Sequence, residues 1–256
     1  MVLGGVDPKS GNPVRSSRGP SRVAGFDLTF SAPKSVSVLF GLADEDTVSA
    51  VRRAHDHAVG QALGYVEREA TFTRRGTNGR EILRGAGLVI AAFRHRTSRA
   101  GDPQLHTHAV VANTTYAGER WSTLDGRVIL RHAKTAGYLY HAALRDQLTQ
   151  ELGVPWGPVE KGTAEIQGID EAVLRHFSRR RVEIEERMDD RGEHTRQATR
   201  TAALDTRRKK DYAVPADRLR EEWRARASEH GLTADDLHRL LPVSYTHLTL
   251  PTIYPV

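Results

Sequence analysis

Two segments rich in apolar and β-branched residues, 88–95 and 105–113, constrain this chain more than any other part of its sequence. The stretch between them is polar and contains Gly101 and Pro103, which favour a reversal of chain direction. Two strands joined by so short a connection pair most readily as antiparallel neighbours. The sequence therefore predicts an antiparallel sheet built around this pair.

A third strand is predicted over 23–31, where apolar residues alternate with small or polar ones and Asp27 faces away from the apolar side. Turn residues predict two hairpins, one around Gly76–Gly79 and one around Asp125-Gly126, with 120–124 pairing with 128–130. Apolar spacings of three and four residues predict helices over 34–40, 47–67, 133–152, 171–188 and 215–230. The fold class expected is α+β.

Three histidines form the strongest chemical signal. His106 and His108 share one face of their strand, and antiparallel pairing brings His95 beside them. Three converging imidazoles suit a divalent ion and leave coordination positions open, as in catalytic metal sites. A chain with 12 histidines also produces a His-X-His pair by chance, so it is the third histidine that favours a metal site. Imidazole nitrogens accept Mg²⁺, Mn²⁺ or Zn²⁺, and the pattern does not choose among them.

Asp27 is the natural partner for one of these imidazoles. Metal-bound histidines commonly donate their second ring N–H to a carboxylate, which fixes the ring's orientation. The alternative is a solvated carboxylate on the outer side of the strand.

A run of arginines surrounds the histidines. Seven arginines and one acid, Glu81, lie between residues 74 and 100, and the whole chain carries a formal charge of +6. Guanidinium groups pair with phosphate oxygens while a metal ion neutralises charge at phosphorus, so this run favours a phosphodiester substrate over a solvated charged surface. The expected DNA-binding or phosphate-binding residues are Lys34, Arg74, Arg75, Arg94, Arg96 and Arg99.

The sequence lacks the residues and motifs that several other classes of chemistry require. The chain has no cysteine, which removes disulfides, thiolate metal sites and cysteine nucleophiles. It has no Gly-x-x-x-x-Gly-Lys phosphate loop, His-Glu-x-x-His pair or Gly-x-Ser-x-Gly elbow. No apolar run approaches the roughly 20 residues of a membrane span, and no signal peptide opens the sequence, so a cytoplasmic location is expected.

Two long motifs carry a family resemblance. Residues 25–37 read GFDLTFSAPKSVS, and 95–108 contain HRTSR and DPQLHTH. Together they resemble the TrwC-type (MobF) conjugative relaxases, with the same order and histidine spacing. The resemblance covers about residues 1–242 and implies an HUH-type antiparallel-sheet palm flanked by helices, with a more helical C-terminal region. We expect a linker-like remnant over 1–21, the palm over about 22–152 and the helical region over about 153–242.

The resemblance also implies an activity. Relaxases are metal-dependent enzymes that nick one strand at an origin of transfer by transesterification, which joins a tyrosine to the 5′-phosphate. By motif position, His95, His106 and His108 would hold the divalent metal ion and Asp27 would orient one imidazole. The implied partners are single-stranded or hairpin DNA at the origin and other relaxosome proteins.

The sequence departs from the family pattern at both ends. Relaxases place the nucleophilic tyrosine ahead of the Gly-Phe-Asp-Leu-Thr-Phe strand, and here no tyrosine precedes Asp27. We therefore expect an N-terminally truncated fragment that binds metal and DNA without forming the covalent adduct. Residues 243–256 contain no Arg, Lys, Asp or Glu, which predicts a tail outside the family domain. A cloning scar, a frameshift or a sequence-assembly junction is favoured over the alternative, a docking peptide.

Two other functions stay open. The first is a DNA-binding module that has lost catalysis, which would bind single-stranded or hairpin DNA in a salt-sensitive way without cleaving it. The second, with less support, is a metal-dependent phosphodiester hydrolase whose ion activates water and leaves free 5′-phosphate ends.

Overall fold

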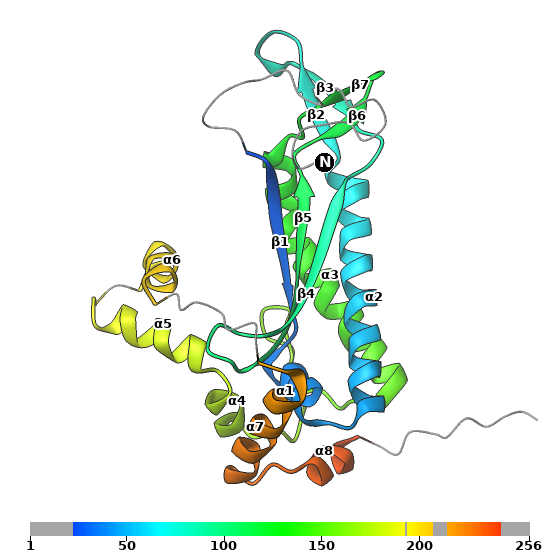
Figure 1. Cartoon of the computed structure of the whole chain (residues 1–256). Helices are drawn as coiled ribbons and strands as arrows, with labels where there is room; N and C mark the ends of the chain where they lie inside the picture. Colours follow the sequence, from blue (N-terminus) through cyan, green and yellow to red (C-terminus); the bar gives the residue numbers. More distant parts are fainter. Residues whose placement is uncertain (1–22, 193, 207–213, 242–256) are drawn as a thin grey trace, which may run out of the picture.

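A three-stranded antiparallel sheet forms the centre of the protein in the computed structural model, which describes residues 23–192, 194–206 and 214–241. Its strands are β1 (Gly25–Ser31), β4 (Ile90–Thr97) and β5 (Pro103–Ala112), in the order β1-β5-β4 (Figure 1). β5 pairs antiparallel with both neighbours, and His95 lies opposite His106 in the register. The predicted antiparallel pair is therefore confirmed.

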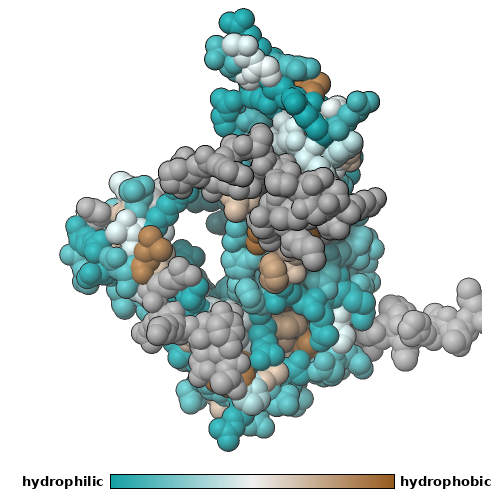
Figure 2. Space-filling model, turned by 45° about the horizontal axis from the view of Figure 1, so that its top comes forward, coloured by the Kyte–Doolittle hydropathy of each residue, from teal (hydrophilic) through white to brown (hydrophobic). Residues whose placement is uncertain are grey.

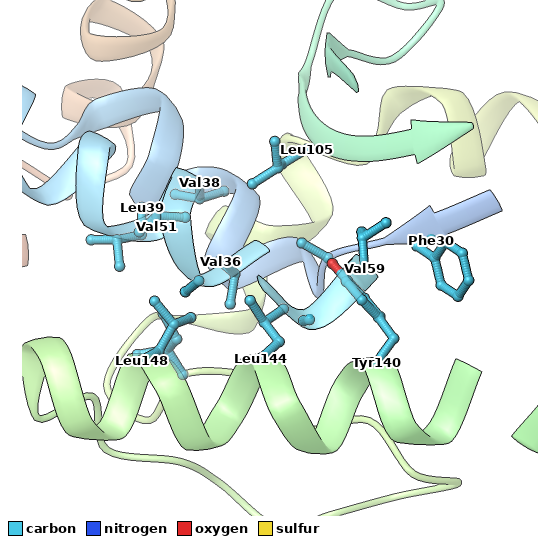
Figure 3. Close-up of a cluster of buried hydrophobic side chains, with 14 of the residues drawn as sticks. Phe30, Val36, Val38, Leu39, Val51, Val59, Leu105, Tyr140, Leu144 and Leu148 are labelled. Carbon is cyan, nitrogen blue, oxygen red and sulfur yellow. The ribbon is translucent and has the colours of Figure 1, made fainter. Parts of the chain in front are cut away.

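Two long helices cover one face of this sheet. α2 (Glu45–Ala70) and α3 (Gly126–Leu152) run side by side along it, and α1 (Lys34–Leu42) packs at its lower end in Figure 1. The buried cluster between them joins side chains from the helices and the sheet, among them Phe30, Val59, Leu105, Tyr140 and Leu144 (Figure 3). Burial of these large apolar groups is the main stabilising term that holds the helices to the sheet.

Strand alternation gives the sheet two different faces. Leu28 and Phe30 of β1 are buried under the helices, whereas Asp27 and Thr29, which alternate with them, are exposed. In β5, Leu105 and Thr107 are buried, while His106 and His108 are half-buried on the opposite face. The pleat thus assigns apolar residues to the core and polar residues to the open face.

Two hairpins lie at the upper end of the sheet in Figure 1. β2 (Phe72–Arg75) pairs with β3 (Glu81–Arg84) across a turn at Thr77–Gly79, which confirms the first predicted hairpin. β6 (Thr115–Ala117) pairs with β7 (Arg120–Ser122), so the second predicted hairpin is wrong. Residues 128–130 belong to helix α3 because the Asp125 carboxylate accepts a hydrogen bond from the Arg127 backbone N–H and caps that helix.

The C-terminal part of the described chain consists mainly of helices, which are α4 (Glu171–His176), α5 (Arg179–Asp189), α6 (Arg196–Asp205), α7 (Ala216–Glu229) and α8 (Ala234–Leu240). The single helix predicted over 171–188 is in fact two. The first ends before Phe177, whose side chain is fully buried in the core, and the second begins at Arg179, whose backbone N–H donates to the buried carboxylate of Asp102. α5 and α6 project from the body, and we call this pair of helices the arm (Figure 1).

Some expectations fall outside the described residues. The remnant over 1–21 and the tail over 243–256 lie there, and the division of the domain near residue 152 stays a prediction. No helix in the described part of the chain is long and apolar enough to cross a membrane.

A buried hydrogen-bonded histidine links both helices to the sheet directly behind the predicted site. His55 of α2 is fully buried, with Nδ1 2.8 Å from the Tyr140 hydroxyl of α3 and Nε2 2.7 Å from the Thr107 hydroxyl of β5. The pKa of His55 is lowered to about 4, chiefly by burial; Asp56 acts in the opposite direction, and Arg94 and His106 add smaller contributions to the lowering. His55 is therefore neutral at pH 7.

This pKa predicts a pH dependence of stability. The unfolded chain takes up a proton at His55 near the ordinary pKa of about 6.5 and the folded chain only near 4, so stability falls as the pH drops through this window. We expect a loss of about 3 kcal/mol attributable to His55. Urea unfolding at several pH values measures it. His55→Gln should flatten the dependence, exposed His57→Gln should not, and equal slopes for both variants would contradict the prediction.

Candidate metal centre and nucleic-acid cleft

Three imidazoles meet on the open face of the sheet. His95 of β4 and His106 and His108 of β5 each offer one ligand atom, and these atoms all lie within 4.8 Å of one another. The ring centroids are 5.1 Å apart for His95 and His106 and 5.3 Å apart for the other two pairs. The structure therefore brings together all three predicted histidines, which we call the triad.

Hydrogen bonds at Nδ1 fix which nitrogen of two triad rings is presented to an ion. Nδ1 of His106 lies 2.8 Å from the carbonyl oxygen of Gln104, and Nδ1 of His108 lies 2.8 Å from Oδ2 of Asp27. A carbonyl or carboxylate oxygen only accepts, so each Nδ1 carries the ring proton and donates it. In the neutral rings, Nε2 then carries the free lone pair that a metal ion requires.

Strand β1 supplies the polar groups that hold His108. Thr29 lies opposite His108 in the register, and its hydroxyl is 3.1 Å from Nδ1 of that ring and 3.4 Å from Oδ1 of Asp27. The Asp27 side chain is half-exposed, so solvent weakens its ion pair with a protonated imidazole. The structure thus places Asp27 where the sequence predicted it, against a triad histidine.

A cleft of about 1130 Å³ opens beside the triad, between the sheet and the arm. Figure 2 shows the opening between the arm and the body of the molecule. His106 and His108 line it, together with five cationic residues, Lys34, Arg99, Arg180, Arg181 and Arg200, and three acids, Asp102, Glu165 and Glu185. We call it the arm cleft. Its cationic excess suits a polyanionic strand.

Lys34 begins α1 at the floor of the arm cleft. Its Nζ donates to the Pro103 carbonyl oxygen at 3.0 Å and to Oε1 of Gln104 at 2.9 Å, which ties α1 to the segment leading into His106. Burial lowers the pKa of Lys34 to about 8, although Asp102 and Glu165 act in the opposite direction. The ammonium form therefore still dominates at pH 7.

The other predicted phosphate-binding residues fall in different places. Arg99 lines the arm cleft, whereas Arg94 and Arg96 line a separate pocket beside His95. The structure does not bring Arg74 and Arg75 to the triad. Arg74 pairs with Asp125 at 2.6 Å, and Arg75 donates to Ser122 Oγ at 2.8 Å in the upper hairpins, so a role for them in binding DNA stays a prediction.

Three arginines of the arm were not predicted as site residues. Arg180, Arg181 and Arg200 line the arm cleft although they lie far from the triad in the chain. The sequence signals were the Arg179–Arg181 run and the basic excess over 191–210. Neither signal shows by itself that these helices face the histidines.

A buried carboxylate joins the arm and α7 to the loop between the metal-binding strands. Asp102 is fully buried and accepts from the Arg179 backbone N–H at 2.9 Å, from Arg179 Nε at 2.8 Å and from Arg226 Nη2 at 3.0 Å. The first of these bonds caps α5 at its N-terminus. Asp102 therefore sets the position of the arm relative to His106, four residues further on.

An antiparallel sheet with helices on one face and three histidines on the other is the arrangement expected of an HUH-type palm. The family model of the TrwC relaxase matches residues 1–230, and the chain belongs to that family. The metal-free structure of the conjugative relaxase TrwC in complex with oriT DNA is similar, with a TM-score of 0.82 and 34% sequence identity, covering 91% of this chain and 83% of the other. The copper-bound TrwC–oriT structure has a TM-score of 0.81 and 35% identity, covering 91% and 80%.

Curated relatives are much longer. The multifunctional conjugation protein TraI of Escherichia coli is 38% identical over 219 residues, which cover 81% of this chain and 12% of TraI. The TraI protein of strain K12 is 37% identical over the same length. This chain thus spans about one-eighth of the relatives that it matches.

The hydrogen bonds and ion pairs of buried Asp102 predict that replacing it with a neutral residue strongly destabilises the fold. Asp102→Asn removes the charge that two guanidinium groups share in a buried site, and we expect a loss of about 3 kcal/mol in the free energy of unfolding, measured by urea denaturation. The arm should also become more sensitive to limited proteolysis than the sheet. Glu185→Gln, which breaks the exposed Arg181–Glu185 pair at 2.6 Å, is the control and should cost less than about 0.5 kcal/mol. Equal costs would contradict the role of Asp102.

Proposed function

We propose that this domain binds a divalent metal ion at His95, His106 and His108 and holds a phosphate of single-stranded DNA beside it, as the DNA-processing part of a conjugative relaxase. The observation that carries the proposal is the triad itself, with Nδ1 of two rings bonded to acceptors and the three ligand atoms within 4.8 Å. Such a set fits a borderline ion and leaves positions open for oxygen ligands. Metal-bound and oriT-bound TrwC structures support the same proposal.

Three groups of residues would have different roles in this proposal: the triad, Asp27 and the cations of the arm cleft. An ion held by the triad would act as a Lewis acid on a phosphate oxygen. Asp27 would hold the ring of His108, and the cations of the arm cleft would pair with neighbouring phosphates. Origin DNA in single-stranded or hairpin form, other relaxosome proteins and a cytoplasmic location belong to the same proposal. The donor set does not choose among Mg²⁺, Mn²⁺ and Zn²⁺.

The family reaction requires a nucleophile that this sequence does not place where the family has it. The described tyrosines lie away from the arm cleft. Tyr140 is buried against His55, Tyr65 bonds to His132 at 2.7 Å, Tyr116 lies in a hairpin, and Tyr138 lies on α3. We propose that residues 1–256 by themselves bind DNA without forming the phosphotyrosyl bond.

Asp27 predicts a graded effect on metal affinity. Asp27→Asn keeps the shape of the side chain but removes the charge that stabilises the ring N–H of His108, so metal affinity should fall about 10- to 100-fold. Isothermal titration with Mn²⁺ or Zn²⁺ measures this change. Asp46→Asn, at an exposed position in the first turn of α2, is the control and should leave the affinity unchanged. An unchanged affinity for Asp27→Asn would contradict the role of Asp27.

The functional proposal is tested by incubation with divalent metal and labelled oligonucleotides that carry a family origin of transfer. We expect retarded complexes on native gels, weaker at high salt and with chelator, and no protein–DNA conjugate on denaturing gels. A conjugate would contradict the proposal that residues 1–256 by themselves form no phosphotyrosyl bond. Free 5′-phosphate ends without attached protein would favour the alternative function, a metal-dependent phosphodiester hydrolase. Binding that is unaffected by chelator or by His108→Ala would favour a DNA-binding module without a metal centre.

A further inference from the structure

A pair of hydrogen-bonded histidines lies at the base of the arm. His176 is the last residue of α4, and His230 caps the C-terminus of α7. Nδ1 of His176 lies 2.9 Å from Nε2 of His230, and the ring centroids are 4.1 Å apart. Neither ring lines the arm cleft, and α4 and α7 lie side by side where the arm leaves the body (Figure 1). We call His176 and His230 the basal pair.

Arg226 of α7 links the basal pair to Asp102. Its Nε donates to Nε2 of His176 at 3.2 Å, and its Nη2 donates to the His176 carbonyl oxygen at 3.4 Å and to Oδ1 of Asp102 at 3.0 Å. The guanidinium also lies over the ring of Phe177, 4.7 Å from its centroid. Phe177 belongs to the short connection between α4 and α5. Arg226 therefore holds the base of the arm against α7, in addition to the bonds between Asp102 and Arg179.

The order of donors along this chain of bonds fixes the charge of both rings. An arginine Nε–H only donates, so Nε2 of His176 accepts with its lone pair. The ring proton of neutral His176 is then at Nδ1, from which it is donated to Nε2 of His230. His230 accepts at Nε2 and carries its own proton at Nδ1. The bonds from Arg226 to His176 and from His176 to His230 thus require two neutral rings.

One additional proton breaks this chain of bonds. Protonated His176 presents an N–H to the Nε–H of Arg226, and protonated His230 presents an N–H to that of His176. Moving the His176 proton to Nε2 relieves the second clash but creates the first. Two facing donors cannot form a hydrogen bond, and the added charge also repels the Arg226 guanidinium. The contacts at the base of the arm are therefore compatible only with a neutral pair.

The charges around the basal pair do not compensate for an added proton. Asp102 is the buried carboxylate nearby, and Arg179 and Arg226 already share it. The pKa of His176 is lowered, chiefly by burial and then by Arg226 and His230; Asp102 raises it, and Arg179 adds a smaller lowering. The bonds of the pair are thus present at neutral pH and are lost as the pH falls. Further charged groups on the packed elements are exposed or already bonded: Arg175 on α4, Glu222 on α7, which pairs with Arg226 at 3.6 Å, and Asp170, Asp236 and Arg239, which line a cavity together with His230.

We propose that the basal pair is a pH-sensitive latch, which holds the arm at neutral pH and loosens its base when the pair takes up a proton. The arm carries Arg180, Arg181 and Arg200, three of the cations that line the arm cleft. The second attachment, between Asp102 and Arg179, contains no histidine, so the arm gains freedom instead of unfolding. The latch operates without a metal ion or DNA, so its test is independent of the proposed function.

The first test is hydrogen exchange of the metal-free chain at about pH 8 and about pH 5.5, which bracket the ordinary titration of histidine. After correction for the intrinsic effect of pH, amides of α5 should exchange about tenfold faster at the lower pH, and those of α2 should not. His176→Ala removes both bonds and should exchange rapidly at both pH values. His230→Gln leaves an amide oxygen that accepts from His176 and takes up no proton, so its acid effect should be smaller. His238→Gln, exposed on α8, is the control and should behave as the parent chain does.

The second test measures the position of the arm. The chain contains no cysteine, so Gln61→Cys on α2 and Glu186→Cys on α5, both at exposed positions, provide two unique sites for spin labels. We expect a narrow distribution of distances at about pH 8 that broadens at about pH 5.5, and a broad one at both pH values in His176→Ala. Equal exchange rates and distances of the parent chain at the two pH values would overturn the latch. So would an acid effect of the parent's size in His230→Gln, because it would assign the change to other histidines, such as the triad.

Discussion

The pairing of β4 with β5 is the interaction on which the rest of the structure depends. It sets His95 opposite His106, and the alternation of β5 places His108 on the same face. A shift of the register by one residue would turn the histidines into the core and Leu105 and Thr107 out of it. The same hydrogen-bonded ladder thus specifies both the hydrophobic core and the metal centre. Helices on one face leave the other face free for chemistry.

The triad is fixed from both faces of the sheet. On the open face, Asp27 and the Gln104 carbonyl oxygen hold two rings through Nδ1. On the covered face, His55 holds Thr107, the residue between His106 and His108, and ties it to α2 and α3. Side chains held in this way lose little further freedom when they bind an ion, which is the physical meaning of a preorganised site. Asp102 then fixes the arm relative to that site.

Local patterns predicted the sheet and the triad because strand alternation and turn residues act over short distances in the chain. They failed where two local signals competed. Asp125-Gly126 reads as a hairpin turn, but the Asp125 carboxylate caps a helix. They also failed where the partner is distant, since Arg179 begins a new helix on account of Asp102, 77 residues earlier. The arm cleft depends on such long-range packing, so no periodicity in the sequence could reveal it.

The central claim is that three imidazole nitrogens of this chain bind one metal ion. Electron paramagnetic resonance of the protein loaded with one equivalent of Cu²⁺ tests it directly, because nitrogen ligands split the spectrum and can be counted. The account predicts couplings from three imidazole nitrogens in the parent chain and from two in His95→Ala. The control variant His57→Ala should give the same spectrum as the parent chain. Fewer than three couplings in the parent chain, or a spectrum unchanged by His95→Ala, would contradict it.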